Sequence, residues 1–350
     1  MAAGVTIMAL ALTLTACGTQ GNTGSTESVK SAETVENTET VESIETMENT
    51  ETVESIETME STETIENVEI IEAMVSESAA PQETANVTPQ MQPVEYTDLQ
   101  QITLDPNWEY ADHSKINTGA AVLYPAQEES GRKGIVIGVN AGHGTAGGAK
   151  VKTLCHPDGS AKVTGGSTAA GATEAAAVSG GMTFQDGTPE REVTLRMAQI
   201  LRDKLLTSGY DVLMLRDSED VQLDNVARTV ICNNVADCHI ALHWDSGDGK
   251  NYDKGCFYIS VPEALKTMEP VASHWQQHDT LGTDLVEGLR EQGAMIYGKG
   301  NMSIDLTQTS YSTIPSVDME LGNAYSDHSD EVLEQLATGL LAGINTYFEQ

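Results

Sequence analysis

This sequence has few basic residues. It contains 18 Lys and Arg against 53 Asp and Glu, which gives a formal net charge of −35 over 350 residues. Proteins bind nucleic acids largely through cations that neutralise phosphates, so this balance argues against a nucleic-acid partner. Cysteine is also scarce, and no zinc-ribbon spacing is present, so we expect free thiols or pairings that the sequence does not define. The five cysteines are Cys17, Cys155, Cys232, Cys238 and Cys256.

The N-terminal apolar run is too short for a membrane span. Residues 5–16, VTIMALALTLTA, are twelve in number, whereas a bilayer core of about 30 Å needs roughly twenty. The run is typical of an export signal, although no Lys or Arg precedes it. The tetrad LTAC, ending at Cys17, resembles the lipobox of bacterial lipoproteins, which implies a lipid on Cys17. We therefore expect residues 1–17 to be a lipoprotein signal peptide and the protein to be anchored at the cell membrane; a plain secretory signal is the alternative.

Residues 18–95 show no sign of a packed core. Glutamate recurs at every third position from Glu33 to Glu72, fourteen times, with no lysine between them. A period of three turns by about 60° at each step around an α-helix, so neither acidic nor apolar residues keep to one helical face. The like charges also repel one another. We expect a disordered acidic stalk rich in Thr and Glu, with docking to a partner as the alternative.

Beyond the stalk, strand-like and helix-like stretches alternate. An amphipathic pattern opens with a cap-type Thr188 and stops at Gly209. Further helices are expected at 222–235, around 281–291 and at 331–348. The expected strands are 135–139, 210–215, 239–242, 256–259 and 316–321. This alternation predicts an α/β fold with a mostly parallel twisted sheet sandwiched by helices.

Two histidines and two glutamates are predicted to meet at one edge of this sheet. His143 follows the first strand in GIVIGVNAGHG, His243 ends HIALH, Glu320 ends SVDME, and Glu190 lies in the first turn of a helix. The carboxyl ends of parallel strands share one edge, where such sheets bind ligands. Each residue alone favours a structural role, such as a hydrogen-bonded imidazole or a partner of the helix dipole. Together they are the inventory of a catalytic zinc site, which needs two imidazoles, a carboxylate ligand and a second carboxylate for proton transfer.

The same residues carry a family resemblance. The chain is similar to zinc-dependent N-acetylmuramoyl-L-alanine amidases of the Amidase_3 type over roughly residues 133–350, in the stretches IVIGVNAGHG, EREVTLRMAQILRDKLLTSGYDVLMLRD, LDNVARTVICNNVADCHIALH and IPSVDMELGN. The resemblance implies that His143, Glu190 and His243 bind one Zn²⁺ and that Glu320 is the catalytic carboxylate. It implies hydrolysis of the amide between N-acetylmuramic acid and L-alanine in peptidoglycan, on the cell-wall side of the membrane. A zinc peptidase acting on stem peptides and a non-catalytic wall-binding lipoprotein are the alternatives.

Three further residues near these motifs are candidates with less defined roles. Arg228 and Asn233 match family positions in the helix before the His243 strand, which implies site support or contact with substrate; for Asn233 a structural cap is the alternative. Trp244 stands where the family usually has a small residue, so it could stack on a sugar or belong to the core. The oligomeric state stays open.

Two segments depart from a minimal catalytic domain of residues 133–350. The insert, residues 144–189, is rich in Gly, Ala, Ser and Thr, and we expect it to cover the substrate side of the site, with an inert insertion or an inhibitory flap as alternatives. Residues 96–132 contain WEYADHSKINTGAAVLY, whose aromatic residues are unusual for a linker. We expect them to pack on the core as an extension.

Overall fold

The computed structural model describes residues 96–126, 131–247 and 249–349. The predicted signal peptide with its lipidation site Cys17 and the predicted stalk lie outside these residues. In the described part, none of the helices combines the length and the apolar composition that a membrane span requires. The four cysteines in this part are buried free thiols, in agreement with the expectation.

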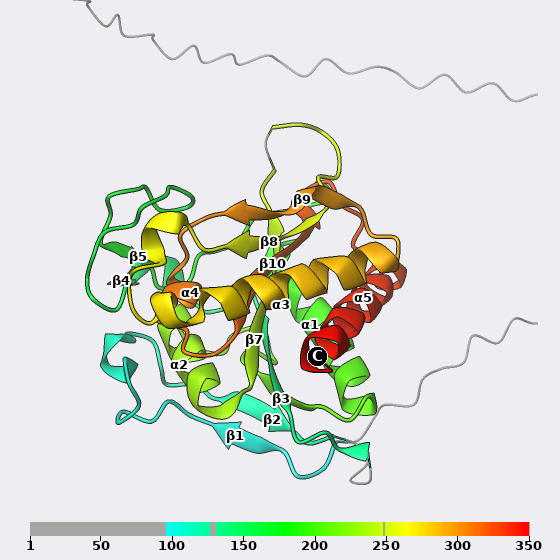
Figure 1. Ribbon diagram of the computed structural model, residues 1–350, viewed down its shortest axis with the longest axis horizontal. Helices are drawn as coiled ribbons and strands as arrows, with labels where there is room; N and C mark the ends of the chain where they lie inside the picture. The colour runs from blue at the N-terminus through cyan, green and yellow to red at the C-terminus, as the bar shows by residue number, and fades with distance from the viewer. Residues whose placement is uncertain (1–95, 127–130, 248, 350) are drawn as a thin grey trace, which may run out of the picture. The chain divides into compact units, whose positions relative to one another are not determined.

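An 8-stranded sheet in the order β1-β2-β6-β3-β7-β10-β8-β9 forms the centre of the fold (Figure 1). Its four central strands, β6, β3, β7 and β10, are parallel to one another. Strand β2 joins β6, and β8 joins β10, in antiparallel pairs. The strands are β1 Gln100–Ile102, β2 Ala121–Tyr124, β3 Val136–Ala141, β6 Asp211–Met214, β7 Cys238–Asp245, β8 Cys256–Ser260, β9 Ile296–Ser303 and β10 Ser316–Asn323. The largely parallel centre confirms the predicted fold class.

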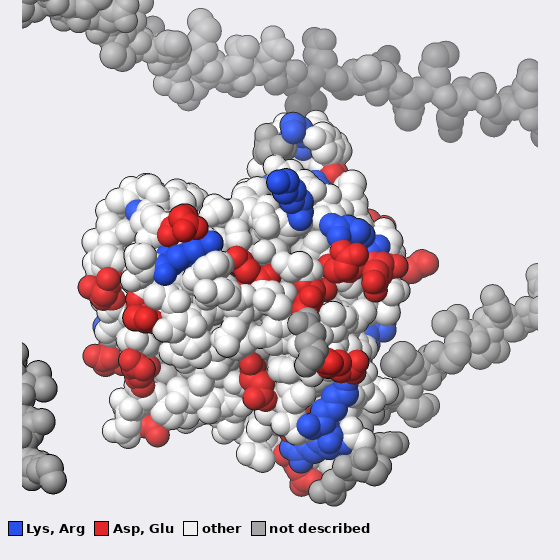
Figure 2. Space-filling view, viewed as in Figure 1, with Lys and Arg blue, Asp and Glu red and all other residues white. Residues whose placement is uncertain are grey.

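Helices cover both faces of this sheet. On one face, α1 (Glu190–Thr207), α3 (Val271–Glu291) and α5 (Asp330–Phe348) bury the main apolar core, and α3 and α5 pack against each other (Figure 1). On the other face lie α2 (Asn225–Val235) and the short α4 (Thr307–Tyr311). The described surface in Figure 2 carries small groups of acidic and basic side chains next to one another, a mixed pattern unlike the acidic repeat of the stalk.

The two faces of the central strands differ in polarity. Side chains alternate along a strand, so Val139 of β3 and Leu242 of β7 point into the main core while their sequence neighbours point toward α2. That second face carries Asn140, which accepts a hydrogen bond from Arg228 of α2. It also carries the C-terminal polar residues of β7 and β10. The polar layer leads up to the carboxyl ends of the strands.

The main predicted elements are present, with different limits in some places. Helix α3 begins at Val271, ten residues before the predicted start. The mainly polar stretch from His274 to Thr280 hides the helical pattern of its apolar residues in the sequence. Strand β9 and helix α4 were not predicted: β9 is an edge strand containing glycines, and α4 has 5 residues. The extension contributes β1 and β2 to the sheet, and the insert forms a small hairpin from β4 (Lys152–Leu154) and β5 (Glu174–Ala176).

Candidate metal centre

Three neighbouring strand ends bring the predicted site residues together. Strands β7 and β10 run in register, with Glu320 directly opposite His243. Strand β3 lies on the other side of β7, and His143 follows its last residue by two positions. Glu190 is the first residue of α1, which starts at the same edge. The structure therefore brings the four residues to the lining of one cavity, as parallel topology leads one to expect.

Three of these side chains direct one atom each toward a common centre. His143 Nε2 lies 2.8 Å from Glu190 Oε1, His243 Nδ1 lies 3.2 Å from the same oxygen, and the two nitrogens are 3.1 Å apart. Tetrahedral zinc with bonds of about 2.0–2.1 Å holds its ligand atoms about 3.3 Å apart. Nitrogen and carboxylate donors at these separations, with a fourth direction left for water or substrate, fit a catalytic zinc ion.

Glycine next to His143 makes this approach possible. A Cβ atom on Gly142 would stand 2.3 Å from the Cε1 atom of His243, so a side chain there would displace a ligand ring. His143 itself has a φ of 66°, in the left-handed region that non-glycine residues rarely adopt. The Gly-His-Gly sequence thus lets the chain turn sharply after β3 and brings two imidazoles into edge-to-face contact, with ring centroids 4.6 Å apart.

Backbone groups orient the ligands. His143 Nδ1 lies 3.0 Å from the carbonyl oxygen of Ser179, which can only accept, so Nδ1 carries the proton and Nε2 keeps its lone pair for a metal. Glu190 accepts hydrogen bonds from the backbone N–H of Met182 at 2.8 Å and of Trp244 at 3.0 Å. Burial raises the pKa of Glu190, but the two adjacent histidines, His143 and His243, hold it below its ordinary value. Ser179 and Met182 belong to the insert, and the sequence analysis did not identify them.

Two buried arginines hold the loop that carries His143. Arg228 donates to the carbonyl oxygens of Ala141 and His143 at 3.1 and 2.6 Å, and Arg216 donates to those of Ala141 and Gly142 at 3.1 and 3.0 Å. Burial and the neighbouring Arg216 lower the pKa of Arg228 to about 9. Arg228 therefore supports the site and does not present a free group to substrate. Arg216 was missed, although its position directly after the Tyr210–Leu215 strand was a usable signal.

The side chains of Asn233 and Trp244 are both held by other parts of the protein. Asn233 donates to the carbonyl oxygen of Tyr311 at 2.9 Å and accepts from the N–H of Thr313 at 3.1 Å, so it fixes the end of α4. The indole of Trp244 is 2% exposed and packs in the main core against Phe184. Sugar stacking by Trp244 is thereby corrected: adjacent residues of β7 point to opposite faces, so His243 at the site requires Trp244 in the core.

The carboxylates of β10 form an acidic patch beside the ligands. Asp318 and Glu320 are two residues apart and so share a face of the strand. Asp318 Oδ2 lies 3.7 Å from His243 Nε2, and one oxygen of each carboxylate has no hydrogen-bond partner in the described part of the chain. Burial and the nearby Asp318 raise the pKa of Glu320 well above its ordinary value. Burial lowers the pKa of His243, but Asp318, Glu190 and Glu320 together raise it to about 10. Protons therefore compete with a metal for this site.

A cavity of about 730 Å³ opens above the metal centre. Strand ends form its floor, the start of α4 forms one side, and the insert forms another, through residues including Lys152, Ala176, Ser179 and Met182. A buried pair fastens the insert, with His156 Nε2 2.9 Å from Asp305 Oδ1. The insert is thus an ordered wall of the cavity.

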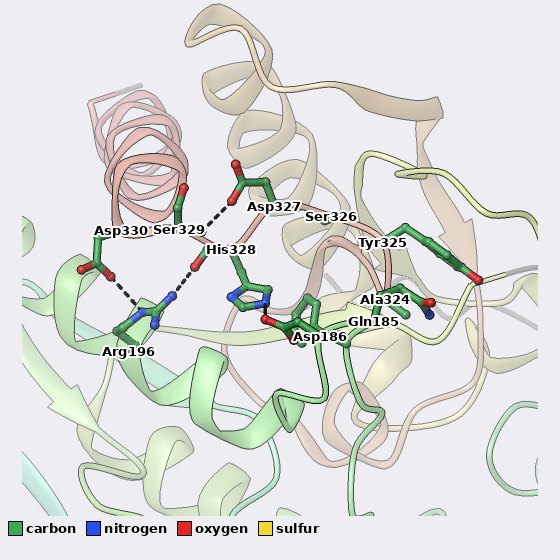
Figure 3. A pocket seen from close by; sticks show the side chains of 11 residues that line it. Gln185, Asp186, Arg196, Ala324, Tyr325, Ser326, Asp327, His328, Ser329 and Asp330 are labelled. Carbon is green, nitrogen blue, oxygen red and sulfur yellow. Dashed lines mark hydrogen bonds and ion pairs between the residues drawn. The ribbon is translucent and has the colours of Figure 1, made fainter. Parts of the chain in front are cut away.

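A second cavity of about 620 Å³ lies between the end of the insert and the loop that leads into α5 (Figure 3). His328 pairs with Asp186 at 3.2 Å, and Arg196 pairs with Asp330 at 3.0 Å. These side chains bind one another, as the dashed lines in Figure 3 show, and none of the three candidate metal ligands lines this space. Of these two cavities, the candidate metal ligands line the first.

Comparison with known proteins agrees with this geometry. Residues 137–344 match the N-acetylmuramoyl-L-alanine amidase family. The apo form of the amidase Ami1 from Mycobacterium abscessus superposes with a TM-score of 0.50 at 19% identity, covering 61% of this chain and 99% of that chain. Ami1 from Mycobacterium smegmatis gives 0.51 at 17% identity, with coverage of 62% and 97%. At such identities these two structures establish a shared fold. A comparison with curated proteins gives no match. Because the family match spans more than half of the sequence, this chain belongs to the N-acetylmuramoyl-L-alanine amidases, enzymes that hydrolyse peptidoglycan.

Proposed function

We propose that the protein is a zinc-dependent enzyme that cleaves the amide bond between N-acetylmuramic acid and the L-alanine of the stem peptide. The observation that carries this proposal is the convergence of His143 Nε2, Glu190 Oε1 and His243 Nδ1 within 2.8 to 3.2 Å of one another at the floor of a cavity. Family membership supplies the substrate class, and the donor set supports the metal.

The three proposed ligands would bind the metal, and backbone groups hold them in position. A bound Zn²⁺ would supply Lewis acidity toward the amide carbonyl and toward a water molecule. His143 and His243 would each offer a nitrogen lone pair once the metal displaces any proton, and Glu190 offers a carboxylate oxygen held by two backbone N–H groups. Because these partners fix the ligand orientations beforehand, little reorganisation is needed when the metal binds.

Glu320 is the proposed proton carrier. Amide hydrolysis adds a water oxygen to the carbonyl carbon and breaks the C–N bond, so one proton must leave the water and one must reach the departing nitrogen. Glu320 lies beside His243 on the adjacent strand and has a raised pKa, which suits a carboxylate that accepts the first proton and donates the second near neutral pH. The peptide then departs with a free L-alanine amine.

The N-terminal segment would place this chemistry at the cell wall. We propose a lipid on Cys17 and an acidic spacer at residues 18–95, which would let a membrane-anchored enzyme reach peptidoglycan outside the cytoplasm. As a flexible coil, a chain of this length spans on the order of 50 Å. This part of the proposal rests on the LTAC motif and the Glu repeat alone.

The test is zinc analysis and product identification with the full-length chain carrying Cys17→Ser, purified without chelator. We expect about one zinc per chain and the release from peptidoglycan of peptides with a new N-terminal L-alanine. A peptidase would instead produce N-termini from within the stem peptide, and a wall-binding protein would release nothing. Either result with zinc-loaded protein would refute the amidase assignment.

A further inference from the structure

One basic side chain that lines the cavity above the metal centre has no hydrogen-bond or ion-pair partner among the described residues. Three basic residues line it in the described part of the chain. Arg228 donates to backbone carbonyl oxygens, and Lys162 donates to the carbonyl oxygen of Asp305. Lys152 is exposed and forms no hydrogen bond or ion pair with any described residue. Its ammonium group is therefore available to a ligand.

Lys152 lies on the part of the insert that reaches the metal ligands. It pairs with Ala176 across the β4–β5 hairpin, and both residues line the cavity. Three residues after Ala176, the carbonyl of Ser179 accepts from His143. Three residues span at most about 10 Å and the cross-strand pair adds about 5 Å, so a peptide a few residues long that binds at the metal centre can reach Lys152.

Buried contacts fix this wall in place. His156, four residues after Lys152, is fully buried against Asp305 of the β9–α4 loop. The backbone N–H of Val163 also donates to Asp305, at 2.7 Å. A wall held by these buried hydrogen bonds presents Lys152 at a defined position, which lowers the entropic cost of binding a ligand there.

The floor of the cavity carries charges of both signs. Glu190, Asp318 and Glu320 line it together with His143 and His243, and a bound Zn²⁺ would add two positive charges. Lys152 on the insert wall is the cation left to attract a carboxylate of the ligand that does not reach the metal. A neutral ligand would gain nothing from it.

We propose that Lys152 and the surrounding insert wall form a subsite for a carboxylate of the stem peptide, close to the amide that is cleaved. This inference rests on the proposed function and adds to it a preference for peptides with free carboxylates over amidated ones. Lys152 is a residue that determines specificity and takes no part in proton transfer.

The test compares native peptidoglycan with the same material after amidation of its peptide carboxylates, using full-length zinc-loaded protein at low substrate concentration. We expect amidation to lower the initial rate of the wild type by about tenfold. Lys152→Met should lower the rate on native material by a similar factor and lose little more on amidated material. Lys150→Met is the matched control, because Lys150 is exposed in the same insert but does not line the cavity.

The outcomes separate this inference from the function on which it rests. If amidation and Lys152→Met lower the rate independently, so that their two factors multiply, the carboxylate subsite is refuted while the amidase assignment stands. The same holds if Lys152→Met is as active as Lys150→Met on native material. A zinc-loaded wild type inactive on native peptidoglycan would refute the proposed function and the subsite together. Zinc content equal in all variants would show that the rate changes do not arise from metal loss.

Discussion

Two clusters of histidine and carboxylate in the described part of the chain are built in opposite ways. His156 and Asp305 are both fully buried and form a closed pair. His143, Glu190 and His243 form an open set that lines a cavity and directs three donor atoms at one point. The same residue types thus serve as a fastening in one place and as a candidate metal centre in the other.

Hydrogen bonding explains the difference. In the closed pair, His156 Nδ1 lies 2.8 Å from Ser160 Oγ, Nε2 faces Asp305 at 2.9 Å, and Asp305 also accepts the N–H of Val163, so every group has its own partner. In the open set, a nitrogen of His143 and a nitrogen of His243 face each other at 3.1 Å. Two lone pairs directed at each other repel unless a proton or a metal lies between them. Incomplete pairing at a cavity floor therefore distinguishes a metal centre from a structural pair.

The largest effect is expected from removing the negative charge of Glu190, the carboxylate ligand of the open set. Glu190→Gln should abolish stoichiometric zinc binding and lower activity by about a thousandfold or more, because it removes the carboxylate donor and the metal supplies several kcal/mol to such reactions. Asp305→Asn is the matched change in the closed pair and should leave the zinc content intact. Zinc per chain after dialysis is the measurement. Equal zinc in Glu190→Gln and wild type would contradict the ligand assignment.

The next largest effect separates metal binding from proton transfer. Glu320→Gln keeps the size of the side chain but cannot carry a proton, so activity should fall by about 10²–10⁴-fold while zinc stays bound. Rates of peptide release and zinc content, measured on the same preparation, provide the comparison. A variant that retains activity would place the proton carrier elsewhere, with Asp318 the next group to test.

Much of the centre could be predicted because it depends on local pattern and parallel topology. Apolar runs that end in His243 and Glu320 place both residues at the carboxyl edge of a sheet, and glycines around His143 mark a turn after a buried strand. Alternation along a strand was also readable, and strict use of it would have placed Trp244 in the core.

The supporting residues of the insert could not be predicted, because their partners are distant in the sequence. Ser179 contacts His143 across 36 positions, and His156 meets Asp305 across 149. The insert has no apolar period, so its ordered hairpin and its role as a wall follow from such long-range contacts. A single sequence carries no signal for them.

Breaking the closed pair should affect stability while leaving the metal in place. His156→Leu leaves the Asp305 carboxylate buried without its main partner, which should lower the free energy of unfolding by about 3–5 kcal/mol. His328→Leu is the matched control, because the His328–Asp186 pair at the second cavity has an exposed carboxylate, so its loss should change the unfolding free energy far less. Urea unfolding of the zinc-loaded proteins measures both. A loss of zinc from His156→Leu would show that the two clusters are coupled.

The smallest expected effect concerns His278, a buried histidine that belongs to neither cluster. Burial lowers the pKa of His278 to about 3, and its Nδ1 accepts the N–H of Ser316. The unfolded chain binds a proton near pH 6.5 and the folded chain does not, so stability falls as the pH drops below about 6.5 and is unaffected above it. At pH 5 this cost is about 2 kcal/mol. In His278→Gln, which can still accept the hydrogen bond, the difference in unfolding free energy between pH 7.5 and pH 5 should shrink by that amount. Contributions of the zinc ligands are common to both proteins and cancel. An unchanged difference would mean that the imidazole gains a proton in the folded state, and thus that it has a partner for its second nitrogen.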